Sequence, residues 1–369
     1  MTSPAPIEPS PKANKTTLSK AHTLGKKRLP FFQTLKAVLS SDLAVYSVRR
    51  LGQALVTLLL ASALCFAVIQ LSPSNYLDAL RLDPKISQAR IKELSQLFGL
   101  DRPPIEQYFR WLWQVVTQLN FGDSFISQRP VVDLLWERVP NTLLLAIASI
   151  ILTWGIAIPL GIVGAVNQNR WLDQLLQVLS YIGQGFPSFI TALALLFFAQ
   201  STPFFPVGGM TSINHDDLNW LGRQLDIGWH MILPTLALSI TSFAGLQRIT
   251  RGNLLDVLRQ NYIQTARAKG LPENRVIYVH ALRNAVNPLI TLLGFEFASL
   301  LGGAFIAEYF FNWPGLGRLT LQAVQAIDLY LIMGTLMMGA AMLILGNFLA
   351  DILLKIVDPR IELDDRGIN

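Results

Sequence analysis

The sequence has little charge and almost no cysteine. Only 15% of its 369 residues are charged, 51% are hydrophobic, and the mean hydropathy is +0.41. Soluble domains carry about 25% charged residues, so this chain is too apolar for an ordinary soluble domain. The single cysteine, Cys65, lies inside an apolar run and permits neither a disulfide framework nor a thiolate metal site. Several apolar runs of about 20 residues can cross a hydrocarbon core of about 30 Å, so we predict an all-α membrane protein.

Catalytic signatures are also missing. No GxxxxGK[ST] phosphate loop occurs, because Gly25-Lys26 has neither the upstream glycine nor the following Ser or Thr. HExxH, CxxC and GxSxG are absent as well. The four histidines are scattered without metal-ligand spacing: His22, His215, His230 and His280. We therefore predict that the chain has no catalytic residues, no metal site and no cofactor.

Six apolar segments predict six transmembrane helices. They are Leu51–Leu71, Asn141–Val166, Leu175–Gln200, Gly228–Leu246, Val286–Phe310 and Leu329–Lys355. A polar insert, residues 72–140, separates the first two. Three helices are expected in the insert, over Pro84–Phe98, Ile105–Leu119 and Val131–Arg138. Gly99 stops the first of them. Trp111 and Trp113 lie on the second, and they indicate either a docking platform or a brace for the first two spans.

Basic residues gather in two places, and this predicts the orientation. Residues 1–50 contain nine basic side chains against Glu8 and Asp42. The segment between the fourth and fifth spans contains seven against Asp256 and Glu273. These seven are Arg248, Arg251, Arg259, Arg267, Lys269, Arg275 and Arg283. Because positive loops stay in the cytoplasm, we expect both termini and this segment inside the plasma (inner) membrane and the insert outside. The net charge of +6 is thus a topology signal, and no nucleic-acid partner is predicted.

The N-terminal region, residues 1–48, is expected to be a cytoplasmic tail. It is rich in Pro, Ser, Thr and Lys and is predicted to be partly disordered, with an interfacial helix over Leu35–Val48. It is not a cleavable signal peptide, because its basic part is too long and no short apolar core with a small-residue site follows.

The segment Asn261–Asn287, NYIQTARAKGLPENRVIYVHALRNAVN, is polar and basic and lies between two long apolar runs. We predict two short helices joined at Gly270-Leu271-Pro272. Gly270 is expected to end the first helix in a left-handed conformation, and Pro272 with Glu273 suits the first turn of the next. A polar helical hairpin held between membrane spans is suited to docking another protein.

The spacing in this hairpin resembles the cytoplasmic EAA loop of ABC importer permeases, in which a Glu-Ala-Ala triplet is followed, after three intervening residues, by Gly. Gln264-Thr265-Ala266 and Gly270 occupy those positions, and TARAKG followed by HALRNA is similar to the dipeptide, oligopeptide and nickel branch. Gln264 in place of Glu and Arg283 in place of Pro depart from the general pattern. The alternative is an ordinary basic loop, which would rarely match the glycine, the helix lengths and the HALRN tail together.

Other segments resemble the same branch in the same order. FGLDRPPIEQYFRWL, GDSF and RPVVDLLWERVPNTL are similar to its extracytoplasmic segment. AEYFFNWPGLGRL and the closing Asp358-Pro359-Arg360-Ile361 follow, with Asn347 and Asp351 between them. The resemblance covers residues 49–361, which we interpret as the permease domain. It includes the insert 72–140 and a coupling loop 248–285, and a short tail, 362–369, follows.

The resemblance implies a transmembrane permease subunit that forms half of the pathway for peptides or a related solute. It implies as partners two ATP-binding subunits that hydrolyse ATP, a second homologous permease and an extracytoplasmic solute-binding protein. The residues assigned to ATPase coupling are Tyr262, Gln264, Thr265, Ala266, Arg267, Lys269, Gly270, Arg275 and His280. The alternatives are a secondary transporter, which would usually show an internal repeat and paired intramembrane charges, and a membrane scaffold, which would not need the hairpin.

Candidate pathway residues lie in the third and fifth spans. Gly183, Gln184 and Pro187 belong to a cluster of Gly and Pro inside a span. Such residues leave backbone groups without helical hydrogen bonds, and protein or water must satisfy them, so the cluster is a candidate lining of the pathway. A helix kink or close helix packing is an equal alternative. Glu296 lies ten residues into the fifth span, counted from Val286. Its carboxylate is expected to face the bundle or a water-filled path, where it could attract a cationic solute. The alternative is a protonated or hydrogen-bonded carboxyl that braces neighbouring helices.

Overall fold

The computed structural model describes residues 42–72, 76–81 and 86–357. Most of the tail expected over 1–48 therefore lies outside the described residues, as do the closing motif 358–361 and the tail 362–369. Of the interfacial helix expected over Leu35–Val48, residues from Asp42 onward belong to the first long helix. In the described part of the chain the secondary structure is helical, apart from an isolated antiparallel bridge between Asp123 and Pro130.

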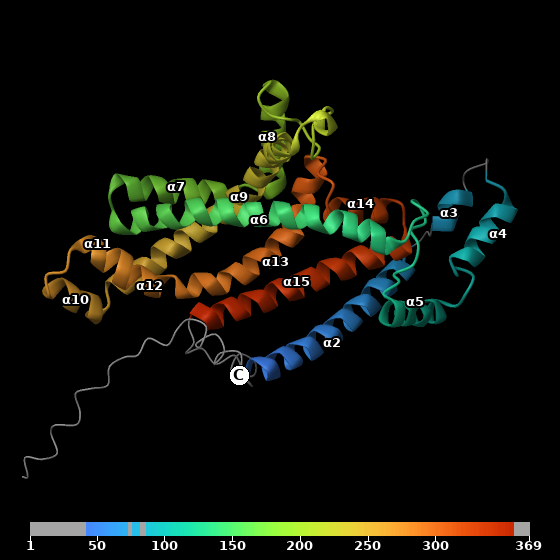
Figure 1. The fold of residues 1–369 in the computed structure, drawn as a ribbon, viewed down its shortest axis with the longest axis horizontal. Coiled ribbons are helices and arrows are strands. Elements are labelled where there is room, and N and C mark those ends of the chain that lie inside the picture. Colours follow the sequence, from blue (N-terminus) through green and yellow to red (C-terminus); the bar gives the residue numbers. More distant parts are fainter. Residues whose placement is uncertain (1–41, 73–75, 82–85, 358–369) are drawn as a thin grey trace, which may run out of the picture. The chain divides into compact units, whose positions relative to one another are not determined.

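Long helices form the body of the protein (Figure 1). They are α2 (Asp42–Gln70), α6 (Val131–Val166), α7 (Trp171–Gly185), α8 (Ser188–Ser201), α9 (Trp220–Leu258), α13 (Asn287–Phe310) and α15 (Leu329–Val357). Among the described residues, four stretches are long and apolar enough to cross a membrane: Tyr46–Gln70, Val131–Val166, Trp220–Leu258 and Leu329–Ile352. The pair α7–α8 makes a fifth if it is counted as one bent span. The protein is a multi-pass membrane protein.

Two groups of short helices lie at opposite ends of the body (Figure 1). The insert contributes α3 (Tyr76–Arg81), α4 (Gln88–Leu97) and α5 (Pro104–Gln118). At the other end a hairpin is formed by α10 (Asn261–Ala268), α11 (Glu273–Arg275), the π-helical turn η2 (Val276–Ala281) and α12 (Leu282–Ala285). Two further elements complete the described chain: the 3-10 turn η1 (His215–Asp217) and α14 (Leu316–Gln325).

Helix α6 replaces two of the expected elements. The sequence indicated a separate insert helix over Val131–Arg138 and a span from Asn141, but a single helix of 36 residues runs through Pro140. Proline removes one backbone donor and usually breaks a helix. Here Val131, Leu135 and Val139 lie on one face and pack against residues of α14 and α15, so tertiary packing outweighs the proline.

Helix α9 is longer than the expected span, Gly228–Leu246. It has 39 residues, and the side chain of Asn219 caps its start by accepting a hydrogen bond from the amide of Gly222 at 2.8 Å. At 1.5 Å per residue it extends about 58 Å, well beyond a hydrocarbon core of about 30 Å. Its polar ends were expected to be loops, yet buried Leu254 and Leu255 continue its packed face toward the hairpin.

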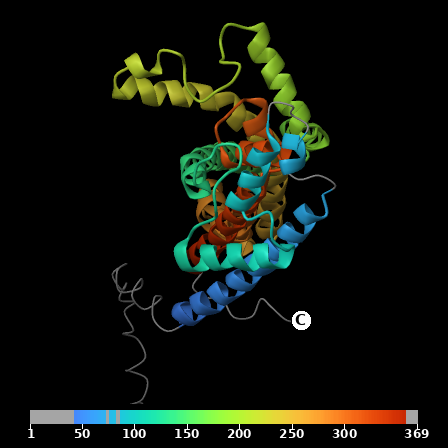
Figure 2. The ribbon, with the colours of Figure 1, turned by 90° about the vertical axis from the view of Figure 1, so that its right-hand side faces the viewer.

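The third expected span is two helices rather than one. The axes of α7 and α8 differ by 98°, and the break falls at Phe186, which is extended, and Pro187, which precedes α8. Because proline disfavours helical conformation in the residue before it, Phe186 ends α7. Helix α8 and the first turns of α9 project from the rest of the body (Figure 1, Figure 2).

The insert follows the prediction in part. Gly99 has φ +67°, as a residue that stops α4 requires, although α4 begins at Gln88 and Pro84 lies outside the described residues. The two tryptophans of α5 differ. Trp111 is 2% exposed and donates its indole hydrogen to the carbonyl of Phe121 at 3.0 Å, whereas Trp113 is 68% exposed. Trp111 is therefore part of the core of the insert, and only Trp113 is available at its surface.

Candidate functional site

The turn of the hairpin has the predicted geometry. Helix α10 ends at Ala268, and Gly270 has φ +74°. The amide of Leu271 donates to the carbonyl of Ala266 at 3.3 Å, the six-to-one hydrogen bond of a Schellman cap. Pro272 then precedes α11, and Glu273 lies in the first turn of that helix. The left-handed conformation predicted for Gly270 is confirmed.

The second arm of the hairpin is less regular than expected. Between α11 and α12 the chain forms a π-helical turn, Val276–Ala281, which widens the helix by one residue. This turn keeps Val276, Ile277 and Ala281 all buried, while His280 is half-buried. Apolar spacing alone does not distinguish a π-turn from an α-helix, so the sequence could not predict it.

The apolar face of the hairpin is buried against the chain itself. Ile263 is 0% and Ala266 9% exposed, and they pack in one cluster with Ile162 of α6 and Leu254 of α9. The structure therefore places Ala266 beneath the hairpin, where it fixes the hairpin to the ends of α6 and α9. Such burial leaves the polar side of the two arms as the surface that faces outward.

Most of the other residues assigned to coupling lie on this outward surface. The exposed ones are Tyr262, Gln264, Thr265, Lys269, Gly270 and Arg275. Two exposed side chains that the sequence analysis did not select, Tyr278 and Val279, lie on the second arm. The side-chain Nδ2 of Asn284 donates to the hydroxyl of Tyr262 at 2.9 Å and ties the two arms together. The outward surface, defined by these exposed residues, is mixed in character: aromatic, polar and basic.

An ion pair closes the turn over Gly270. Arg267 donates from Nη2 to Oε1 of Glu273 at 2.6 Å and from Nε to Oε2 at 3.2 Å. This guanidinium holds the pKa of the Glu273 carboxyl below its usual value. Both side chains are more than a third exposed, so solvent screens the pair and it adds little to stability. Its geometric effect is to fix the spacing of the two arms.

A polar cleft of about 410 Å³ lies between the hairpin and the ends of α6 and α9. Its lining includes Gln264 and Arg267 of the hairpin together with Arg170 and Arg259. Three arginines against Glu273 make the cleft basic. Gln264, which stands where the general family pattern has Glu, thus faces a basic cleft from α10.

The candidate pathway residues lie at three places in the described part of the chain: on α7 against α9, at the break between α7 and α8, and on α13. A Cβ on Gly183 would lie 3.3 Å from the Cβ of Ala244, so this glycine allows α7 to pack closely on α9. Gln184 and Pro187 are exposed at the break between α7 and α8. Glu296 of α13 is half-buried, accepts a hydrogen bond from the hydroxyl of Ser242, and has one carboxylate oxygen without a partner. The roles of these four residues in a pathway stay predictions.

The AEYFFNWPGLGRL segment is organised around a buried carboxylate, that of Glu308. Glu308 is 0% exposed and accepts hydrogen bonds from the hydroxyl of Thr142 at 2.6 Å and from the amide of Arg318 at 3.0 Å. It therefore caps the start of α14 from a different helix. A side chain on Gly315 would collide with the carboxylate, which accounts for a glycine there. The sequence showed the motif but not this contact, because its residues lie on three different helices.

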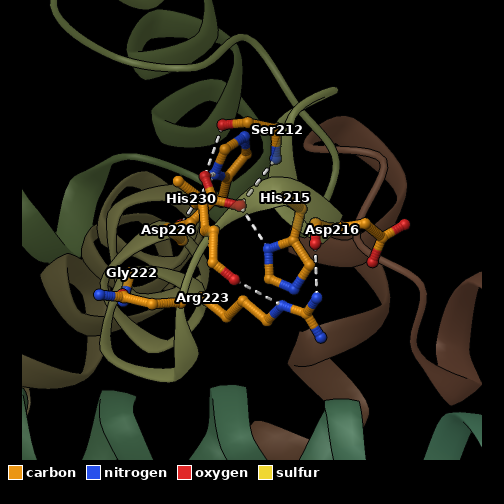
Figure 3. A network of polar contacts seen from close by, with 9 residues as sticks. Ser212, His215, Asp216, Gly222, Arg223, Asp226 and His230 are labelled. Atoms are coloured by element: carbon orange, nitrogen blue, oxygen red, sulfur yellow. Dashed lines mark hydrogen bonds and ion pairs between the residues drawn. The ribbon is translucent and has the colours of Figure 1, made fainter.

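A second carboxylate stiffens the projecting segment before α9 (Figure 3). Asp226 accepts hydrogen bonds from the amide of Ser212 at 2.9 Å and its hydroxyl at 2.5 Å, and its Oδ2 lies 2.7 Å from Nδ1 of His215. His230, one turn further along α9, lies 3.4 Å from the other oxygen. Among the described residues no three His, Cys, Asp or Glu side chains are placed to hold a metal ion.

Comparison with known proteins gives matches over most of the chain. Residues 157–363 match the family described as binding-protein-dependent transport system inner membrane component, and residues 43–146 match the description of the N-terminal part of such membrane components. The oligopeptide transport system permease protein AppB of Bacillus subtilis (strain 168) is 40% identical over 322 residues, 87% of this chain and 100% of that protein. The peptidoglycan transport system permease protein YejB of Agrobacterium fabrum is 35% identical over 303 residues, 80% of this chain and 81% of that protein. A solved inward-facing structure of the MetNI methionine ABC transporter matches with a TM-score of 0.49 and 16% identity over 61% of this chain and 97% of that one.

Proposed function

This chain belongs to the binding-protein-dependent transport system inner membrane component family, and from this membership we propose that it forms half of the translocation pathway of an ATP-driven importer for peptides or a related solute. It is a permease subunit, and ATP hydrolysis takes place on separate ATPase subunits. The solute class rests on the relatives, which are named as permeases for oligopeptides and for peptidoglycan. Neither a secondary transporter nor a structural scaffold accounts for this membership.

The proposed topology has six spans, with both termini and the hairpin in the cytoplasm. Helices α7 and α8 together serve as the third span, and α13, a helix of 24 residues, as the fifth. The excess of basic residues in the segment 248–285 supports this orientation. The placement of the insert and the hairpin at opposite ends of the body is consistent with it (Figure 1).

The proposed partners are two ATP-binding subunits, a second homologous permease and a solute-binding protein. An ATP-binding subunit docks on the outward surface of the hairpin, and the solute-binding protein docks outside the membrane on the insert. The observation that supports the hairpin as a docking element is its burial pattern. Ile263 and Ala266 are held against α6 and α9, and the exposed residues of the hairpin are mainly polar or aromatic.

The proposed mechanism follows from this attachment. When the ATPase subunits close on ATP, they displace the hairpin. Because the hairpin is packed on the ends of α6 and α9, the displacement is passed to these helices rather than absorbed by a flexible loop. Gln184, Pro187 and Glu296 are proposed to lie along the path that opens and closes.

Cross-linking tests the docking step. Single cysteines replace Thr265, Lys269 or Tyr278 on the outward surface, in a chain whose Cys65 is changed to Ser. The matched control replaces Trp113, which is also exposed but lies on the insert. Covalent adducts with the ATP-binding subunit are expected from the hairpin positions and not from position 113. Adducts from position 113 alone would contradict the proposed orientation, because they would place the insert on the cytoplasmic side.

A further inference from the structure

Helices α7 and α9 are joined by a buried polar contact close to the hairpin. Arg251 donates from Nε to Oδ1 of Asp173 at 2.5 Å and from Nη2 to Oδ2 at 2.7 Å. The side chain of Asp173 is 0% exposed. Its Oδ2 also accepts a hydrogen bond from the amide of Asn169 at 2.9 Å. The carboxylate is thus fully enclosed, and the two-pronged contact fixes the rotation of α9 relative to α7.

Two more contacts continue along the same two helices. The hydroxyl of Ser180 donates to Oε1 of Gln247 at 2.7 Å, and both side chains are buried. Further along, Gly183 packs on Ala244. The positions on α7 rise while those on α9 fall, so the two helices run antiparallel. We call these three contacts the α7–α9 ladder: Asp173–Arg251, Ser180–Gln247 and Gly183–Ala244.

Helix α6 packs on the Asp173–Arg251 contact of the ladder, and a glycine, Gly164, lies at the point of contact. A Cβ on Gly164 would lie 3.3 Å from Cδ of Arg251 and 3.4 Å from Oδ1 of Asp173. The first distance is tighter than nine in ten real Cβ contacts and the second is at the limit of ordinary van der Waals contact, so a glycine here lets α6 lie directly against the ion pair. The ion pair is therefore enclosed by three helices, including both of those on which the hairpin packs.

The ladder lies between two features that matter for transport. Arg251 is in the last two turns of α9, which ends at Leu258, and the hairpin begins at Asn261. At the far end of the ladder, Gly183 is three residues from Phe186, where α7 breaks and the chain turns by 98° into α8.

We propose that the Asp173–Arg251 pair is a positioning contact that makes α7 follow α9, so that movement of the hairpin reaches the break between α7 and α8. The inference rests on the proposed function, since it takes the hairpin as the place where ATP-driven movement enters. Separating the pair would leave a buried charge uncompensated, so α7 cannot slide on α9 as it could across an apolar contact. Removal of the pair leaves the apolar packing of both helices in place but loses their fixed register.

The test uses the complete importer in proteoliposomes: both permeases, the ATP-binding subunits and the solute-binding protein. Uptake of peptides from a tryptic casein digest is read by mass spectrometry, and ATP hydrolysis is measured in the same vesicles. The variants are Asp173→Asn, Arg251→Gln and the double variant that combines them. The matched control is Arg50→Gln, which breaks the Arg50–Asp351 ion pair between α2 and α15, away from the hairpin and the insert.

Each single variant is expected to lower the uptake per ATP hydrolysed by about tenfold, a typical coupling effect between two sites. It should also lower the amount of protein in the membrane, because one buried charge loses its partner. The double variant separates the two effects. It carries no lone charge, so its abundance should recover, but the contact is still missing and its uptake per ATP should stay low. Arg50→Gln should leave the uptake per ATP hydrolysed unchanged, since Asp351 keeps its hydrogen bond from Tyr46.

Recovery of coupling together with abundance in the double variant would overturn the inference, since the pair would then only support folding. Normal coupling in well-inserted single variants would overturn it as well. Absence of ATP-dependent peptide uptake in the unaltered importer would be a different result, because it contradicts the proposed function itself.

Discussion

Replacement of Gly270 tests the backbone conformation on which the hairpin depends. Gly270 has φ +74°, and a Cβ added there would meet no atom within 4 Å. Crowding by neighbouring atoms therefore contributes nothing, and the free-energy cost of replacing Gly270 comes from its left-handed backbone conformation alone. That cost is about 1–2 kcal/mol for an ordinary residue, higher for a β-branched one and small for Asn. The series Gly270→Asn, Gly270→Ala and Gly270→Val thus applies increasing strain without changing any contact.

The strain acts on the link between the two arms. Relief of the left-handed conformation would break the hydrogen bond from Leu271 to Ala266 and separate Arg267 from Glu273. A strain of about 1–2 kcal/mol changes a conformational population about 5- to 30-fold. We expect all three variants to insert normally. Uptake per ATP hydrolysed should be near normal for Asn, reduced for Ala and lowest for Val.

The assay measures ATP hydrolysis and peptide uptake in proteoliposomes, with membrane abundance measured alongside. Normal uptake by a well-inserted Gly270→Val variant would refute the reasoning. Equal losses for Asn and Val would also refute it, because the two residues differ mainly in their tolerance of this backbone conformation.

Three further predictions concern other regions. Arg267 lowers the pKa of Glu273 in the folded protein. The pair therefore stabilises the hairpin at pH values above 4.5, the usual pKa of a glutamate, and this stabilisation is lost as the pH falls through the lowered pKa. Proteolysis of the hairpin should increase slightly as the pH falls below 4.5, because the solvent-screened pair contributes less than about 1 kcal/mol of stability, and Glu273→Gln should abolish this pH dependence. Trp111→Ala should destabilise the insert by about 3–5 kcal/mol in thermal unfolding, whereas Trp113→Ala should leave stability unchanged, and the opposite order would contradict the burial of Trp111. Glu296→Gln should depress uptake of cationic peptides and spare neutral ones, and equal uptake of both would make Glu296 a structural residue.

The sequence predicted best where one residue determines the local backbone. Gly99 and Gly270 were each expected to stop a helix, and both have positive φ. The break at Pro187 was not predicted: the sequence indicated one span over Leu175–Gln200, with a helix kink as one explanation for its Pro and Gly residues. Local chemistry of this kind does not depend on distant parts of the chain.

Features that depend on packing between distant residues could not be predicted. Helix α6 runs through Pro140 because its buried face continues on both sides, against α14 and α15. Ala266 matched a coupling motif, but its burial depends on where α6 and α9 end. Asp173 and Arg251 are 78 residues apart and showed no pattern that pairs them. Single-sequence reasoning places such residues on helices but does not show which helices meet.

The central claim is that this chain is a permease half driven by ATP-binding subunits. The most direct measurement is peptide uptake into proteoliposomes that contain the chain alone or the complete importer, with ATP, without ATP, or with a proton or sodium gradient. The account predicts uptake only by the complete importer and only with ATP. Uptake by the chain alone under an ion gradient, or ATP-independent uptake by the complete importer, would contradict it.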